Sequence, residues 1–177
     1  MISADSSVLT VSGARPVVDD SAFVAAGARV IGAVTLGAES SVWYNAVLRA
    51  DSAPITIGAG SNLQDNVSVH VDAGRPVVLG ENVSVGHNAV VHGCTIGDGT
   101  LIGMGSVVLS GAQIGSGSLV AGGAVVLEDM VVPPNSLVAG VPAKVRRELT
   151  EEERAAIRRN ADTYRAHVQA HRVAQAG

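Results

Sequence analysis

A small aliphatic residue recurs at every sixth position over most of this 177-residue chain. The longest unbroken run starts at Ile96 and ends at Val138, with an aliphatic side chain at each step of six. Such self-similarity at a fixed period is the sequence signature of repeat architectures, in which neighbouring units bury each other's apolar faces. Because glycine, asparagine or aspartate often lies next to the aliphatic residue, each hexad is expected to form a short strand and a bend.

The composition favours a narrow solenoid. Apolar residues make up 47% of the chain but aromatic residues only 2%, so the core must consist of small aliphatic side chains. The repeat resembles that of hexapeptide-repeat proteins, and this resemblance implies that three strands make one triangular coil. We therefore predict an all-β solenoid over residues 1–145, a left-handed parallel β-helix of six to seven coils stacked about 4.8 Å apart.

The last part of the chain has the pattern of a helix. Thr150 and Glu153 form a capping box, which predicts a helix from Thr150 to about His171. We assign residues 146–177 to a capping segment of the same domain, packed along the solenoid. The side chains expected to pack there are Ala156, Ile157, Tyr164 and Val168.

The charge and the cysteine content exclude several classes of function. The net charge is −4 and no basic tract occurs, so a nucleic-acid partner is not expected. No run of about 18 apolar residues occurs, so no segment is expected to cross a membrane. One cysteine, Cys94, and the absence of a secretory signal predict a cytoplasmic location. Cys94 is expected to be a buried small hydrophobic residue rather than a nucleophile.

Three histidines lie close to the breaks in the repeat. Extra residues interrupt the hexads around Asp51 and within Val71–Arg75, and insertions in a solenoid leave it as loops, often on the binding side. His70 and His92 occupy the same slot, three hexads apart once the loop is set aside. They are therefore expected to stack one coil apart, as two ligands of one metal.

His87 falls on the preceding face and is expected to reach the same metal from a neighbouring subunit. Cyclic threefold symmetry would create that contact at each subunit interface, so we predict a homotrimer. Three neutral histidines with one open position are typical of a catalytic zinc site.

Further polar residues are expected at the same interface. Arg49 shares the face of His70, and Gln64 and Asp65 share the face of His87, each one coil earlier. Arg49 is expected to form an intersubunit ion pair with Asp65 or Asp51. Gln64 is expected to orient metal-bound water or to hold a ligand histidine.

These residues together carry a resemblance to a known family. The matching pieces are Arg49-x-Asp51, Gln64-Asp65, His70, Gly86-His87 and His92-Gly93-Cys94. The chain resembles the γ-class carbonic anhydrase family of left-handed β-helix proteins. The resemblance implies zinc, with iron or cobalt as alternatives, held by His70, His87 and His92, and hydration of carbon dioxide to bicarbonate.

The chain departs from the best-studied members of that family at two proton-transfer glutamates. One aligns with Ser52, and the other belongs to an acidic loop that is here only Val71–Arg75. Asp72 and Tyr164 are the candidates for that proton transfer.

Other interpretations stay open. The same site could hydrolyse a thioester or another small ester, or the metal could only stabilise a non-catalytic scaffold. A hexapeptide acyltransferase is a further alternative, because the segment AGVPAKVRR is similar to theirs. His167 and His171, spaced as a metal-binding pair, are expected on a solvated face, and Trp43 and Tyr44 are expected to anchor packing.

Overall fold

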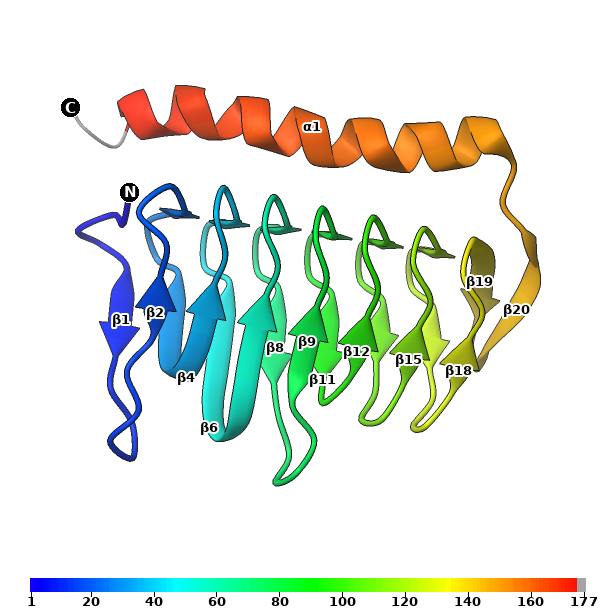
Figure 1. Cartoon of the computed structure of the whole chain (residues 1–177), viewed down its shortest axis with the longest axis horizontal. Helices are drawn as coiled ribbons and strands as arrows, with labels where there is room; N and C mark the ends of the chain where they lie inside the picture. Colours follow the sequence, from blue (N-terminus) through cyan, green and yellow to red (C-terminus); the bar gives the residue numbers. More distant parts are fainter. Residues whose placement is uncertain (175–177) are drawn as a thin grey trace.

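The computed structural model shows a parallel β-solenoid of about seven turns with one long helix, α1 (Glu151–Ala174), along its side (Figure 1). Residues 1–174 are described. The predicted left-handed β-helix with a C-terminal helix is confirmed. In Figure 1, α1 runs back along the column, so it passes the edges of successive coils.

One face of the solenoid is an eight-stranded sheet in the order β20-β19-β16-β13-β10-β7-β5-β3. Its strands pair in parallel, except that β20 turns back antiparallel to β19 and closes the end of the column. The strands are β3 (Phe23–Val24), β5 (Ser41–Val42), β7 (Asn62–Leu63), β10 (Ser84–Val85), β13 (Leu101–Ile102), β16 (Leu119–Val120), β19 (Ser136–Gly140) and β20 (Ala143–Glu148).

The remaining strands form one twelve-stranded sheet, because the long strands β4 and β6 continue from one face into the next. The N-terminal part of β6 pairs with β8, and its C-terminal part pairs with β9. The strands are β1 (Ser7–Leu9), β2 (Val17–Val18), β4 (Arg29–Leu36), β6 (Val47–Ile57), β8 (Ser68–His70), β9 (Val77–Leu79), β11 (Val90–His92), β12 (Thr95–Ile96), β14 (Val107–Val108), β15 (Gln113–Ile114), β17 (Val125–Val126) and β18 (Val131–Val132).

The periodic aliphatic residues form the core, stacked in register from coil to coil. Leu48 pairs with Val69, and Val69 pairs with Val91, and each of the three is at most 1% exposed. Since alternate side chains of a strand point to opposite faces, a slip of one residue would turn this row outward. The register is therefore determined by burial, and it also fixes the height of every neighbouring polar residue.

The helix begins at the predicted capping box. The backbone N–H of Thr150 donates to Glu153 Oε2 at 2.8 Å, and that of Glu153 donates to Thr150 Oγ1 at 3.2 Å. The buried side chains of α1 are Ile157, Ala161 and Val168. Ala156 is exposed, so its predicted contact with the solenoid is wrong. Ala161 and Val168 follow Ile157 by four and eleven residues, which keeps them on one helical face, whereas Ala156 lies about 100° away from Ile157.

The boundary between solenoid and helix lies close to the predicted one. Strand β20 ends at Glu148 and α1 begins at Glu151. The division of a single domain into 1–145 and 146–177 stays a prediction, and its last three residues, 175–177, lie outside the described part. Within residues 1–174, no helix has the length and apolarity needed to cross a bilayer.

A small aromatic cluster docks α1 onto the first coils. Trp43 is 4% exposed and packs with Phe23 and Val168. The ring of Tyr164 meets the ring of Trp43 edge-on, with centroids 5.3 Å apart. The expected anchoring role of Trp43 is therefore confirmed, and Tyr44 packs against the same cluster.

Cys94 lies in the main core and is 1% exposed. Burial raises the pKa of its thiol to about 12, so the thiol stays protonated and is a poor nucleophile at neutral pH. The expectation of a buried small hydrophobic residue is confirmed.

We expect Trp43→Ala to lower the free energy of unfolding by about 3–5 kcal/mol, because it removes the largest side chain between α1 and the solenoid. Urea unfolding followed by far-ultraviolet circular dichroism measures this. Leu127→Ala is the control, because Leu127 is 47% exposed and its loss should cost about 0.5 kcal/mol or less. Equal losses in the two variants would contradict the docking role of Trp43.

Candidate metal centre

The first two predicted ligands lie side by side. His70 ends β8 and His92 ends β11, and the parallel register pairs them directly. His70 Nδ1 lies 2.9 Å from His92 Nε2, and the ring centroids are 5.0 Å apart. Arg49 of β6 pairs with His70 on the other side, one coil earlier. Three successive coils thus bring Arg49, His70 and His92 to one line along the same face.

Asp51 connects Arg49 to this pair within the chain. His70 Nε2 lies 3.1 Å from Asp51 Oδ1, and Arg49 donates to Asp51 Oδ2. Burial alone would raise the pKa of Asp51, but the hydrogen bonds from His70 and Arg49 outweigh it and hold the pKa below its ordinary value. The carboxylate is therefore ionised at neutral pH and accepts from both neighbours. Within one chain, Arg49 pairs with Asp51 and not with Asp65.

Two residues that the sequence did not identify as a pair contact the far side of His92. His92 Nδ1 lies 2.9 Å from Ser110 Oγ, and Ser110 Oγ donates to Asp72 Oδ2 at 2.7 Å. Ser110 is 5% exposed. No motif marks Ser110, because it follows His92 by 18 residues in an otherwise ordinary bend. The available signal was the 18-residue coil length itself, which places position 110 directly after position 92 in the stack.

His87 lies at a different corner of the column. Its Nδ1 is 2.9 Å from Asp65 Oδ2, and its Nε2 is 3.1 Å from the hydroxyl of Tyr164 in α1. Asp65 Oδ1 also accepts from the backbone N–H of Tyr44 at 3.1 Å. Asp65 therefore holds His87 in place inside the same chain. The sequence predicted Asp65 only as an ion-pair partner of Arg49 and did not predict this contact.

The three histidines do not converge within one chain. His70 and His92 adjoin the loop between β8 and β9, which projects away from α1 (Figure 1), whereas His87 contacts α1 through Tyr164. Among residues 1–174, no three histidine, cysteine, aspartate or glutamate side chains form a group that could hold a metal ion. A site with three histidines therefore requires a second copy of the chain.

The pair of imidazoles fits part of a metal site. A tetrahedral metal that holds two nitrogens at 2.0–2.1 Å separates them by about 3.3 Å. His70 Nδ1 and His92 Nε2 are 2.9 Å apart, so a widening of a few tenths of an ångström would suffice. The donor chemistry is also suitable, because imidazole is a common ligand of zinc, iron and cobalt.

Gln64 is buried, and among residues 1–174 its side chain makes no hydrogen bond to a histidine. It is 5% exposed, and its Nε2 donates to Asn62 Oδ1 at 3.1 Å. Together with His87 and Tyr164 it lines a cavity of about 560 Å³. The rest of that cavity is formed by Gly86, Leu101, Ile102, Gly103, Met104, Leu119, Ala121, Gly122 and Asn160.

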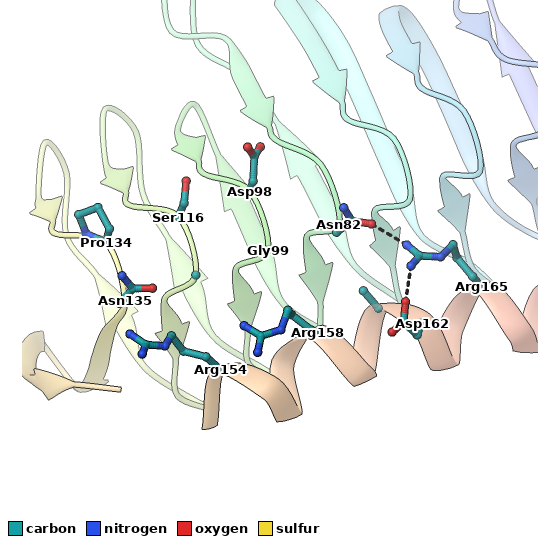
Figure 2. A pocket seen from close by; sticks show the side chains of 12 residues that line it. Asn82, Asp98, Gly99, Ser116, Pro134, Asn135, Arg154, Arg158, Asp162 and Arg165 are labelled. Carbon is teal, nitrogen blue, oxygen red and sulfur yellow. Dashed lines mark hydrogen bonds and ion pairs between the residues drawn. The ribbon is translucent and has the colours of Figure 1, made fainter. Parts of the chain in front are cut away.

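Another cavity of similar size, about 540 Å³, lies between α1 and the solenoid (Figure 2). Its arginines are already paired: Arg165 donates to Asn82 and Asp162, and Arg154 and Arg158 share Glu151. None of the predicted site residues lines it. These ion pairs lie within α1, and the hydrogen bond from Arg165 to Asn82 ties the helix to the solenoid. The candidate chemistry lies elsewhere.

The histidines of α1 take no part in a metal group. His171 Nδ1 lies 2.8 Å from the hydroxyl of Tyr44, and its ring packs edge-on against Trp43. His171 is therefore partly buried in the docking cluster, not on the solvated face expected for it. His167 is exposed, as expected.

Tyr164 is expected to ionise above pH 10, its ordinary pKa, because burial and then the charge of Asp65 raise the pKa of its hydroxyl. Alkaline titration of tyrosinate absorbance in the wild type minus that in Tyr164→Phe isolates this group. Asp65→Asn removes the nearby charge and should move the midpoint down. A midpoint at or below pH 10 in the wild type would contradict the partial burial of this hydroxyl near Asp65.

Comparisons with known proteins agree with the hexapeptide repeat. The family described as bacterial transferase hexapeptide (six repeats) matches residues 76–108 and 93–128. A solved structure of a hexapeptide transferase family protein from Anaplasma phagocytophilum has a TM-score of 0.89 and 39% identity, and the match covers 92% of this chain and 96% of that one.

The curated relatives carry a more specific name. A Methanocaldococcus jannaschii protein named "Probable carbonic anhydrase" is 56% identical over 80% of this chain and 89% of its own length. Gamma carbonic anhydrase 1, mitochondrial, of Arabidopsis thaliana is 41% identical over 93% of this chain, which spans 62% of that longer protein. The chain belongs to the γ-class carbonic anhydrase-like family of hexapeptide-repeat proteins.

Proposed function

We propose that this chain is a metal-dependent lyase of the carbonic anhydrase type, which hydrates carbon dioxide to bicarbonate as a homotrimer. The observation that carries the proposal is the pair His70 and His92, one coil apart with their nitrogens 2.9 Å from each other. Two imidazoles in that arrangement, in a chain of this family, are suited to share one divalent metal.

The third ligand in this proposal is His87 of the next subunit. Within the described residues, His87 lies at another corner, so one chain alone leaves the pair without a third histidine. A head-to-tail contact that closes after three subunits would supply one His87 to each pair. Asp65 can also take part in that interface, because a carboxylate has about four acceptor sites and only two are used here. Arg49 of the neighbouring subunit is the proposed partner.

Zinc is the proposed metal, with iron or cobalt as alternatives. When bound, it would lower the pKa of a coordinated water toward about 7. The chain's own residues would then orient the site: Asp51 accepts from His70, and Asp65 accepts from His87. Gln64 is proposed to face the reacting water from the buried side, since it lines the same cavity as His87.

Proton removal is the step that this chain supports least. The hydroxyl of Ser52, at the position of a missing glutamate, donates to the carbonyl of Val71 at 3.1 Å and offers no basic group. The raised pKa of Tyr164 keeps its hydroxyl protonated, so in the metal-free chain it donates to His87 Nε2 while His87 Nδ1 donates to Asp65. A metal bound at His87 Nε2 would replace that hydrogen bond from Tyr164. We therefore propose that Tyr164 orients its neighbours, and that protons leave through buffer or through the exposed Asp72.

Stopped-flow hydration of carbon dioxide and metal analysis test the proposal. The wild type should contain one metal per subunit and hydrate carbon dioxide faster than buffer alone. His87→Ala and His92→Ala, each expressed alone, should lose both the metal and the hydration activity. Co-expression of those two variants should restore about a quarter of the sites by random mixing into closed trimers, because an intact pair can then meet an intact His87.

The matched control is co-expression of His70→Ala with His92→Ala. These two residues must come from the same subunit, so no mixture of these variants can rebuild a site. Recovery in both mixtures, or in neither, would contradict a metal shared between subunits. A wild-type rate equal to that of buffer would exclude carbon dioxide hydration.

Hydrolysis of a small thioester is a second candidate, and the cavity of about 560 Å³ beside His87 favours it. That volume greatly exceeds the share of one water in the liquid, about 30 Å³, and carbon dioxide does not need it. Ala121→Leu should narrow the cavity, so it should reduce thioester turnover while metal content and carbon dioxide hydration persist. A panel of acyl-thioesters that all hydrolyse at the buffer rate would exclude this activity.

The cytoplasmic location stays a prediction. It rests on the single cysteine, which is buried.

A further inference from the structure

The far side of His92, opposite the nitrogen that faces His70, carries a short hydrogen-bonded relay in which Ser110 has no role in the proposed function. It consists of Asp72, Ser110 and His92, in that order. Ser110 Oγ lies 2.7 Å from Asp72 Oδ2 and 2.9 Å from His92 Nδ1. The direct separation of His92 Nδ1 from Asp72 Oδ2 is 3.6 Å, so Ser110 is the link between them.

The relay determines which nitrogen of His92 carries the proton. A carboxylate can only accept, so the single hydroxyl hydrogen of Ser110 is donated to Asp72. Ser110 Oγ can then only accept from His92, which places a hydrogen on Nδ1. Nε2 of His92 consequently keeps its lone pair, and this is the atom that faces His70.

The local backbone is shaped to make this contact. Gly93 has a φ of 53°, and a Cβ atom there would lie 2.8 Å from Ser110 Oγ. Any side chain at position 93 would therefore displace the hydroxyl, in addition to the strain of the left-handed conformation.

The loop that carries Asp72 is tied to the solenoid by a second contact. The backbone N–H of Arg75 donates to the carbonyl of Asp72 at 3.0 Å, which closes the loop. Arg75 Nη1 then reaches Asp129 Oδ1 at 2.6 Å, three coils along the column. The short loop is thereby held against the coils, with its carboxylate over Ser110.

We infer that Ser110 and Asp72 are positioning residues for His92, which hold its imidazole as the Nδ1–H tautomer and direct the Nε2 lone pair to the metal. The inference rests on the proposed function for the identity of the bound group. Such hydrogen-bond partners of ligand histidines typically change metal affinity by about 10–100-fold when they are removed.

Zinc affinity and the tautomer of His92 test the inference together. In competition with a chromophoric chelator, full-length Ser110→Ala should bind zinc about 10–100-fold more weakly than the wild type. Asp72→Asn should lose less zinc affinity than Ser110→Ala, because the amide oxygen of the asparagine can still accept a hydrogen bond from Ser110. In the metal-free protein at alkaline pH, histidine ¹⁵N spectra should show Nδ1–H for His92 in the wild type and a shift toward Nε2–H in Ser110→Ala.

Ser118→Ala is the matched control, because Ser118 is also a buried solenoid serine and its hydroxyl donates to the carbonyl of Pro133, away from the histidines. It should leave both readouts unchanged. An unchanged tautomer in Ser110→Ala would overturn the inference, even if zinc binding weakened. A wild type that binds no zinc would overturn the proposed function instead. The ¹⁵N spectra would still show whether Ser110 holds His92 as the Nδ1–H tautomer.

Discussion

The in-register parallel stacking of the coils is the constraint on which the rest of the molecule depends. The strands of each coil pair with those of the coils before and after it, and each buried aliphatic side chain sits directly over the previous one. A residue's place within its hexad therefore decides its face, and the count of hexads decides its height. This is why His70 and His92, separated by 22 residues in sequence, meet as direct neighbours.

A second theme is that each of the three histidines has an acceptor beside it. Asp51 serves His70, Asp65 serves His87, and Ser110 with Asp72 serves His92. The three carboxylates are partly exposed, and ion pairs in such surroundings contribute little to stability. Their value is orientational, because a ring held at one nitrogen presents the other in a fixed direction.

The fold and the stacked pair could be predicted by counting hexads, once the resemblance to hexapeptide-repeat proteins supplied three hexads for each coil. A period of six and a coil of three hexads give the faces, the core and the pairing of Arg49, His70 and His92 without any knowledge of side-chain conformation. The contacts of α1 were harder to predict from the sequence, since the helix repeats about every 3.6 residues and the solenoid every six. Ala156 was chosen where Ala161 packs, and the contact of Tyr164 with His87 depends on how the helix lies against the coils.

The sequence by itself determined the architecture and the line of polar residues on one face, because burial of a strictly periodic aliphatic row admits one register. Only the tertiary structure decided which acceptor each histidine uses. Ser110 reaches His92 because Gly93 leaves room, and Asp72 joins them because Arg75 ties its loop to Asp129. Such contacts depend on how far each side chain extends around a corner of the solenoid. That distance is a few ångströms, and no sequence period specifies it.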